Sequence, residues 1–281
     1  MFSAVKNIAL GVTMFFMVTS CTSELASNKV SLSHGIDESS GGDPAYIIKI
    51  SNATFYLDKK GGGLSSILDN DGVDWLGFHK AAGSGHKGEY RGFPNAIHKQ
   101  DGSYFHAMNA TTLPSSSAVN VESPNHVRIT FTSENKKWQG QWDFYPEHCD
   151  FTMTDVSAGY KYWVLYEGVP GGEMNDSDYW YSSADKEYHP IKEDYLGDLP
   201  APEWFAFGDE SYSRMLFVLH HEDDEYPDDY VSRPDMTVLG FGRSNKDKYL
   251  DTPQRFSIGF IETTEYQKVE NFIKKILNSA Y

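Results

Sequence analysis

The sequence predicts an all-β protein: an antiparallel β-sandwich with one α-helix at its C-terminal end. Composition is the first reason, because 15% of the 281 residues are aromatic and aromatic residues favour strands. The second is a series of short runs rich in β-branched and aromatic residues, separated by Gly, Asn and Asp turn signals. Such a series is typical of a jelly roll or related sandwich.

The strand-like runs follow one another along most of the chain. They lie at 46–50, 53–58, 64–69, 74–78, 126–132, 138–146, 149–156, 162–168, 203–208, 214–220, 236–242 and 255–262. Two long stretches without such a pattern, 79–125 and 168–202, interrupt the series. Irregular segments of this length in a compact domain are usually functional.

Residues 264–280 have the period of an amphipathic helix. Thr264 followed by Gln267 matches a capping box. We expect this helix to pack on the sandwich through one apolar stripe. The stripe consists of Tyr266, Val269, Phe272, Ile273, Ile276 and Leu277.

The N-terminal region is predicted to lie outside the fold. Lys6, the apolar run 8–18 and the ending "VTSC" are typical of a lipoprotein signal peptide, here residues 1–20, with lipid attached to Cys21. The alternative is an ordinary signal peptide with an incidental cysteine. Residues 21–44 are expected to form a flexible tether and 45–281 a single catalytic domain. Since Thr22 rather than aspartate follows Cys21, we expect an outer-membrane anchor.

Charge and cysteine content restrict the partners. The net charge of −16 argues against nucleic acid, whose phosphates need a basic surface. An anionic glycan could still bind through a local basic pocket. Only Cys149 then remains in the domain, so no internal disulfide forms, and we expect it to be buried. We expect a monomer without an obligatory cofactor.

A metal site has weak support in the run 220–230, which places His220 and His221 beside six acidic residues. Its spacing is not that of an EF-hand loop, and no HExxH pattern occurs. A solvated acidic turn is the simpler interpretation, although a structural calcium ion stays an open alternative.

The first long irregular stretch gathers chargeable side chains. The segment "GEYRGFPNAIHK" (88–99) and the segment 100–109 after it combine hydroxyl, amide, imidazole and cationic groups. A solvated loop is the alternative interpretation. The candidate residues are Tyr90, Arg91, Asn95, His98, Lys99, Tyr104 and His106.

This mixture suits β-elimination from a uronic acid. Removal of the weakly acidic C5 proton becomes easier when cationic or amide groups neutralise the adjacent carboxylate. Arg91, with Asn95 or Lys99, is expected to hold that carboxylate. His98 or His106 is the expected base.

A second acid–base group must protonate the leaving oxygen. Tyr90 or Tyr104 is the expected acid, with Tyr166 as a further candidate. The sequence does not assign base and acid more narrowly.

The second long stretch offers groups for sugar binding. Glu167 ends a strand-like run and could accept hydrogen bonds from hydroxyls. At least one of Tyr179, Trp180 and Tyr181 is expected to be exposed, with Trp180 and Tyr181 as stacking platforms. The alternative is that these aromatic residues fasten the loop to the sheet.

Several segments resemble known secreted proteins. Residues 55–78 resemble the opening strands of mutarotase-like supersandwich domains, and 88–99, 162–172 and 236–243 are similar to segments of β-sandwich lipoproteins from marine polysaccharide utilisation loci. The resemblance is closest to the ulvan lyase and ulvan oligosaccharide dehydratase class. It implies a carbon–oxygen lyase that leaves a 4,5-unsaturated uronyl product.

The sequence leaves two other functions open. One is a non-catalytic glycan-binding lipoprotein, and the other is an aldose mutarotase or epimerase. The sequence does not distinguish a lyase from a dehydratase, which differ in whether a sugar or water leaves.

Overall fold

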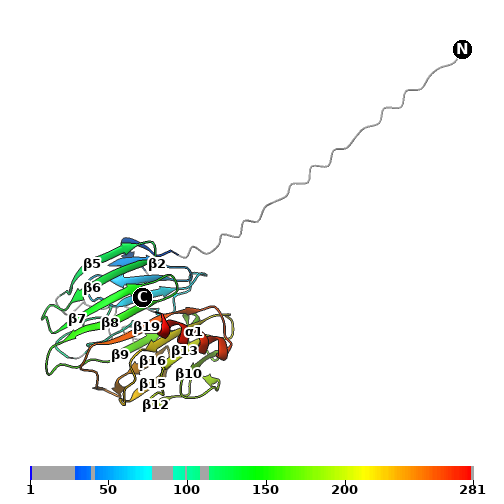
Figure 1. The fold of residues 1–281 in the computed structure, drawn as a ribbon. Helices are drawn as coiled ribbons and strands as arrows, with labels where there is room; N and C mark the ends of the chain where they lie inside the picture. Colours follow the sequence, from blue (N-terminus) through cyan, green and yellow to red (C-terminus); the bar gives the residue numbers. More distant parts are fainter. Residues whose placement is uncertain (2–28, 39–41, 78–90, 99, 108–113, 280–281) are drawn as a thin grey trace.

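A computed structural model describes Met1 and residues 29–38, 42–77, 91–98, 100–107 and 114–279. Within this part of the chain the predicted fold class is confirmed: antiparallel sheets stack as a sandwich, with one α-helix near the C-terminus (Figure 1).

Strands make up most of the regular structure along the chain. In sequence order the elements are β1 (Ser31–Asp37), β2 (Asp43–Lys49), β3 (Thr54–Asp58), β4 (Leu64–Leu68), β5 (Ser116–Ser123), β6 (His126–Thr132), β7 (Trp138–Phe144), β8 (Cys149–Val156), β9 (Val164–Gly168), the 3-10 turn η3 (Pro170–Gly172), β10 (Asp178–Ser182), β11 (His189–Pro190), β12 (Tyr195–Gly197), β13 (Glu203–Asp209), β14 (Met215–His220), β15 (Asp228–Arg233), β16 (Met236–Phe241), β17 (Arg243–Ser244), β18 (Asp247–Lys248), β19 (Gln254–Ile261) and α1 (Tyr266–Asn278).

One layer is a nine-stranded sheet in the order β11-β10-β13-β14-β19-β8-β7-β6-β5. The other contains two four-stranded sheets, β1-β2-β3-β4 and β12-β15-β16-β9. The segment around Gly92 and Phe93 joins these two. Phe93 forms a bridge with Leu64 of β4, and Gly92 forms one with Glu167 of β9.

The core lies between the layers. The inward-facing residues of both layers form one large apolar cluster, which includes Trp142 of β7, Tyr166 of β9 and Phe207 of β13. Because side chains alternate between the faces of a strand, the neighbours of these residues point away from the core. Those outward faces are where binding groups can lie.

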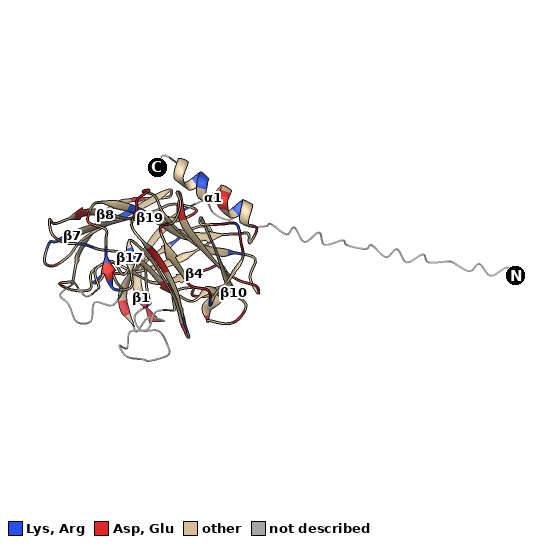
Figure 2. Cartoon of the chain, turned by 90° about the horizontal axis from the view of Figure 1, so that it is seen from below, with Lys and Arg blue, Asp and Glu red and all other residues tan. Residues whose placement is uncertain are grey.

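Helix α1 covers part of the outward face of the nine-stranded sheet (Figure 2). Val269, Ile273 and Ile276 are buried there, and the rest of the predicted stripe packs around them. The predicted capping box is wrong: Glu265 is the N-cap, and no side-chain hydrogen bond caps the N-terminus of the helix.

The ordered domain begins before Ala45. Strand β1 lies inside the predicted tether and pairs with β2 along its whole length. Four further strands occupy the predicted irregular stretches: β5, whose residues are all exposed or half-buried, in the first, and β10 with the short strands β11 and β12 in the second. In contrast, the described part of the predicted run 74–78 forms no strand, only a single bridge between Asp74 and Leu68. Polar edge strands such as β1 and β5 carry little of the apolar alternation on which sequence assignment depends.

Cys149 is buried and unpaired, as predicted. Among the described residues, no helix combines the length and the apolar character of a membrane span.

Candidate functional site

A pocket of about 400 Å³ opens on the outward face of the β12-β15-β16-β9 sheet. It draws its walls from the first irregular stretch, from β9 and from the segment after β16. The lining residues are Asn95, His98, His106, Trp163, Leu165, Glu167, Arg233, Arg243, Asn245, Lys246 and Lys248.

Alternation along β9 decides which of its residues reach the pocket. Leu165 and Glu167 line it, whereas Val164 and Tyr166 belong to the core cluster on the other face. Tyr166 is fully buried and its hydroxyl donates a hydrogen bond to the carbonyl oxygen of Trp75 (2.7 Å). Glu167 is therefore a site residue and Tyr166 a core residue, which contradicts the catalytic role predicted for Tyr166.

Backbone pairing brings the first irregular stretch to β9. Gly92 and Glu167 exchange two backbone hydrogen bonds (2.9 and 3.0 Å), and the amide of Leu165 donates to the carbonyl of Pro94 (2.7 Å). Asn95 then adopts a positive φ of 42°, which asparagine tolerates better than most residues. Its side-chain nitrogen donates to a carboxylate oxygen of Glu167 (2.6 Å), so Asn95 orients Glu167 in the pocket wall.

His106 is placed by close backbone packing against the glycines after β3. The amide of Phe105 donates to the carbonyl of Gly61 (2.7 Å). A Cβ at Gly61 would lie 1.6 Å from the carbonyl oxygen of His106, and one at Gly63 would lie 2.8 Å from its Cα. Only glycine permits this approach. The ring of His106 lies 6.3 Å from the ring of His98, centre to centre.

Arg243 forms the charged floor of the pocket. Its Nη1 donates to Asp229 (2.6 Å) and its Nε donates to the carbonyl of Asn245 (3.0 Å). A Cβ at Gly240 would lie 2.5 Å from Arg243 Cδ, so this glycine leaves space for the arginine to cross β16. Burial raises the pKa of Asp229, and the adjacent Arg243 opposes that shift. The pair thus holds a buried guanidinium in place.

Lys248 and Trp163 support the wall beside Arg243, whose guanidinium carbon lies 5.3 Å from the centre of the Trp163 ring. The ammonium of Lys248 lies 3.9 Å from the centre of the Trp163 ring and donates to the carbonyl of His98 (2.7 Å). The indole nitrogen of Trp163 donates to the carbonyl of Asn95 (2.8 Å). These contacts tie His98 and Asn95 to the segment after β16.

The pocket has the opposite charge to the chain as a whole. The chain has 40 acidic and 24 basic residues, yet the pocket lining includes four cationic side chains and one carboxylate. The cationic residues are Arg233, Arg243, Lys246 and Lys248, and the carboxylate is that of Glu167. A local basic pocket of this kind favours an anionic ligand.

Two predicted residues lie elsewhere in the described structure. Arg91 donates to the carbonyls of Gly77 and Asp235, is buried and does not line the pocket. Tyr104 is buried against Trp138. These placements argue against a carboxylate-binding role for Arg91 and an acid role for Tyr104, because both side chains are engaged in the interior.

The predicted sugar-stacking platform is wrong. Trp180 is buried and stacks on His189 at 3.9 Å, and its indole nitrogen donates to the carbonyl of Glu193 (3.0 Å). Tyr181 is half-buried and packs edge-on against Tyr266 of α1. Both therefore fasten β10 to its surroundings. Tyr90, Lys99 and Cys21 lie outside the described residues.

The acidic run 220–230 does not assemble a cation site in the described structure. His220 is held by Glu203 and by Gln254 (2.9 Å) on the core side of β14. His221 follows β14 and contacts Ser257 and Arg255 rather than the groups around His220. No group of three or more His, Cys, Asp or Glu residues among those described is arranged to hold a metal.

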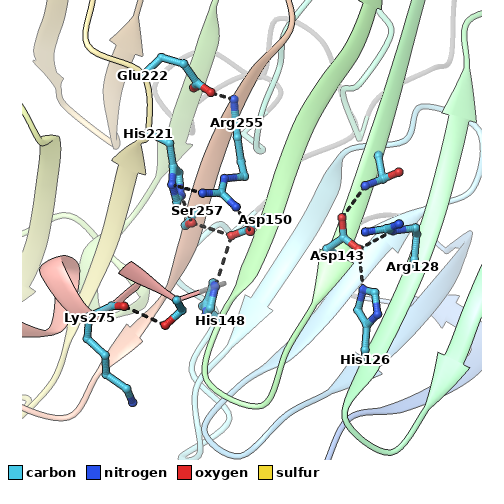
Figure 3. Close-up of polar contacts among 12 residues, drawn as sticks. His126, Arg128, Asp143, His148, Asp150, His221, Glu222, Arg255, Ser257 and Lys275 are labelled. Atoms are coloured by element: carbon cyan, nitrogen blue, oxygen red, sulfur yellow. Dashed lines mark hydrogen bonds and ion pairs between the residues drawn. The ribbon is translucent and has the colours of Figure 1, made fainter. Parts of the chain in front are cut away.

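A second polar cluster has the composition of a Ser-His-Asp triad but not its chemistry (Figure 3). Arg255 donates to Nδ1 of His221 (2.8 Å), so the proton of the neutral ring lies on Nε2, 2.6 Å from Ser257 Oγ. Ser257 in turn donates to Asp150 (2.6 Å). The histidine therefore donates to the serine and cannot act as its base. Burial lowers the pKa of His221 to about 3, and Ser257 is fully buried.

Asp178, the first residue of β10, is expected to make the stability of the protein depend on pH. Burial raises the pKa of Asp178 from 3.8 to about 8, and the neighbouring Asp209 adds to this shift. The folded state thus keeps a proton that the unfolded state loses, so stability falls as pH rises from about 4 to 8. Asp178→Asn should leave the melting temperature almost unchanged near pH 4 and raise stability by about 1–2 kcal/mol near pH 9. Thermal unfolding of the wild type and of Asp178→Asn between about pH 4 and pH 9 tests this prediction. The same dependence of stability on pH in both proteins would contradict it.

Comparisons with known proteins identify the fold. No protein-family model and no curated protein matches the chain. The crystal structures similar to it include that of HI1317, with a TM-score of 0.54 and 13% identity over 83% of this chain and 100% of the other. They also include that of YeaD from Salmonella typhimurium, named as a mutarotase by sequence, with a TM-score of 0.50 and 12% identity over 82% and 94%. At these identities the likeness shows a mutarotase-like sandwich and nothing more.

The sequence analysis did not predict the pocket residues that follow β9 in the sequence. Arg243 and Lys248 lie in the segment after a strand, where their contact with the first irregular stretch depends on the tertiary fold. A local signal existed nonetheless: residues 243–248 contain three of the 24 basic residues of an acidic chain.

Proposed function

We propose that the chain is a carbon–oxygen lyase acting on a uronic-acid residue of an anionic poly- or oligosaccharide such as ulvan. The observation that carries the proposal is the pocket itself: His98 and His106 share it with four cationic side chains. The cations supply a place for the carboxylate, and the imidazoles supply proton transfer. Arg243 takes the role that the sequence analysis gave to Arg91.

The reaction needs one base and one acid. The base removes the C5 proton, the C–H electrons form the C4=C5 bond, and the C4–O bond breaks as its oxygen receives a proton. Cationic groups near the carboxylate stabilise the charge that develops before that bond breaks. His98 and His106 can divide the two proton transfers between them, with one neutral and the other protonated.

Product formation tests this proposal. The protein should convert uronate oligosaccharides to products that absorb ultraviolet light, because the new C=C bond is conjugated with the carboxylate. Mass spectrometry then separates the two leaving groups, since loss of water and loss of a sugar give different masses. A panel of glucuronate- and iduronate-containing glycans that yields no unsaturated product would exclude the lyase.

A second candidate is a mutarotase or epimerase of an anionic sugar. Glu167 lies in the same pocket as the two histidines, and a carboxylate with an imidazole can serve as base and acid for ring opening. The likeness to YeaD concerns the fold alone. Exchange between anomers in NMR spectra, without a new product, would favour this candidate.

The non-catalytic glycan-binding alternative depended on Trp180 as an exposed stacking surface, and Trp180 is buried. Calorimetric binding without any chemical change would still identify it. We retain as proposals the lipid at Cys21, the outer-membrane location, the monomeric state and a reaction without an obligatory cofactor.

A further inference from the structure

A second pocket, of about 410 Å³, lies beside the first. It is formed by the segment before β10, by residues that follow β11, and by the turn between β15 and β16. Its apolar side is made by Met174, Ile191 and Pro234, and polar groups include Lys192 and Asp194.

Arg233 connects the two pockets. It is exposed at the end of β15 and lines both of them. In the sheet register Arg233 pairs with Met236, and Val238 pairs with Glu167, so these residues share the outward face. Glu167 and Arg233 thus lie on the same face of the sheet, with the buried Met236 and Val238 of β16 between them.

A buried apolar cluster lies on this face between the pockets. Met236 and Val238 of β16 form a buried cluster with Val169, and Met174 of the second pocket packs against it. Met174 therefore contacts this cluster and also lines the second pocket. The two pockets are therefore neighbours that share Arg233 and are separated by this buried cluster.

The two pockets differ in charge. In the first, cationic side chains outnumber the single carboxylate. In the second, Lys192 pairs with Asp176 (2.5 Å), and Asp194 accepts a hydrogen bond from the amide of Ser232 (3.0 Å). Opposite charges thus balance on one side, with apolar side chains on the other. This combination suits a sugar ring, which has an apolar C–H face and hydroxyls at its rim.

We propose that the second pocket is a subsite for the sugar next to the uronate, and that the ligand is an acidic oligosaccharide of at least two residues. The uronate occupies the first pocket, the adjoining sugar occupies the second, and Arg233 contacts both at their junction. This inference rests on the proposed function, because it assumes that the first pocket holds a uronate.

The test compares ligand lengths in a binding experiment. Calorimetry or ligand-observed NMR would measure glucuronate and rhamnose-linked glucuronate oligosaccharides against the full chain. The oligosaccharides should bind at least about tenfold more tightly than the monosaccharide, equivalent to about 1.4 kcal/mol. Ser232→Trp, at a residue that lines the second pocket and not the first, should remove this advantage and leave glucuronate binding unchanged.

Ser232→Ala is the matched control and should bind both ligands like the wild type. Equal affinity of wild type for both lengths, or an oligosaccharide affinity that Ser232→Trp leaves unchanged, would overturn the subsite. Length-dependent binding that Ser232→Trp abolishes, in a protein that forms no unsaturated product, would support the subsite while rejecting the lyase. No binding of either ligand would reject the uronate pocket and with it the subsite.

Discussion

Replacing His98 and His106 together with alanine should reduce kcat on a uronate oligosaccharide by about 10²–10⁴-fold, the usual contribution of positioned acid–base groups. Both rings line the pocket, 6.3 Å apart between centres. No other imidazole lines it in the described structure, so no neighbouring histidine can substitute. Initial rates measured by ultraviolet absorbance, with KM determined for each single variant, test this expectation.

Two control variants separate catalysis from folding. Tyr166→Phe removes a hydroxyl that is bonded to the Trp75 backbone in the core, and Ser257→Ala removes one from the buried cluster of Figure 3. Neither residue reaches the pocket, so both variants should retain kcat within about twofold, even if their melting temperatures fall. Wild-type turnover in the double histidine variant would refute the assigned base and acid.

Arg243→Gln should weaken binding of a carboxylated ligand by about 10–100-fold, because hydrogen bonds to charged groups contribute about 1.5–3 kcal/mol. The guanidinium lies in the pocket floor, held by Asp229 and by the Asn245 carbonyl. Titration calorimetry of folded protein with a uronate oligosaccharide measures the effect. Added salt should weaken wild-type binding more than binding by the variant.

The arginine also stabilises its neighbour, so this variant needs its own control. Without Arg243, the buried Asp229 carboxylate would lose its ion-pair partner and keep the hydrogen bond from the Asn245 amide. The double variant Asp229→Asn/Arg243→Gln removes both charges and should recover much of the thermal stability. It should not recover ligand affinity. If affinity returned with stability, Arg243 would be a structural residue only.

Much of the fold follows from local sequence pattern. Apolar alternation located β6, a continuous apolar run located β14, and the stripe from Val269 to Ile276 located the helix. The polar edge strands β1 and β5 escaped prediction because little of their surface is buried. In such strands the pairing partner, rather than the apolar period, determines the conformation.

The site was only partly predictable. His98, His106, Asn95 and Glu167 do meet in one pocket. Tyr166 was misassigned although it adjoins Glu167, because the sequence showed a strand without showing which face met the core.

The cationic side of the pocket is a tertiary feature. Lys248 contacts the backbone of His98 across 150 positions of sequence, and no local pattern predicts such a contact. The same limit applies to Trp180, whose burial depends on stacking with His189 from the neighbouring strand β11.

The most direct test of the central claim is whether the pocket recognises a carboxylate. Calorimetry would compare a uronate oligosaccharide with the same oligosaccharide after reduction of its carboxyl groups to alcohols. We predict that wild type binds the acidic form at least about tenfold more tightly and that Arg243→Gln removes this preference. Equal affinity of the wild type for both forms would contradict the account.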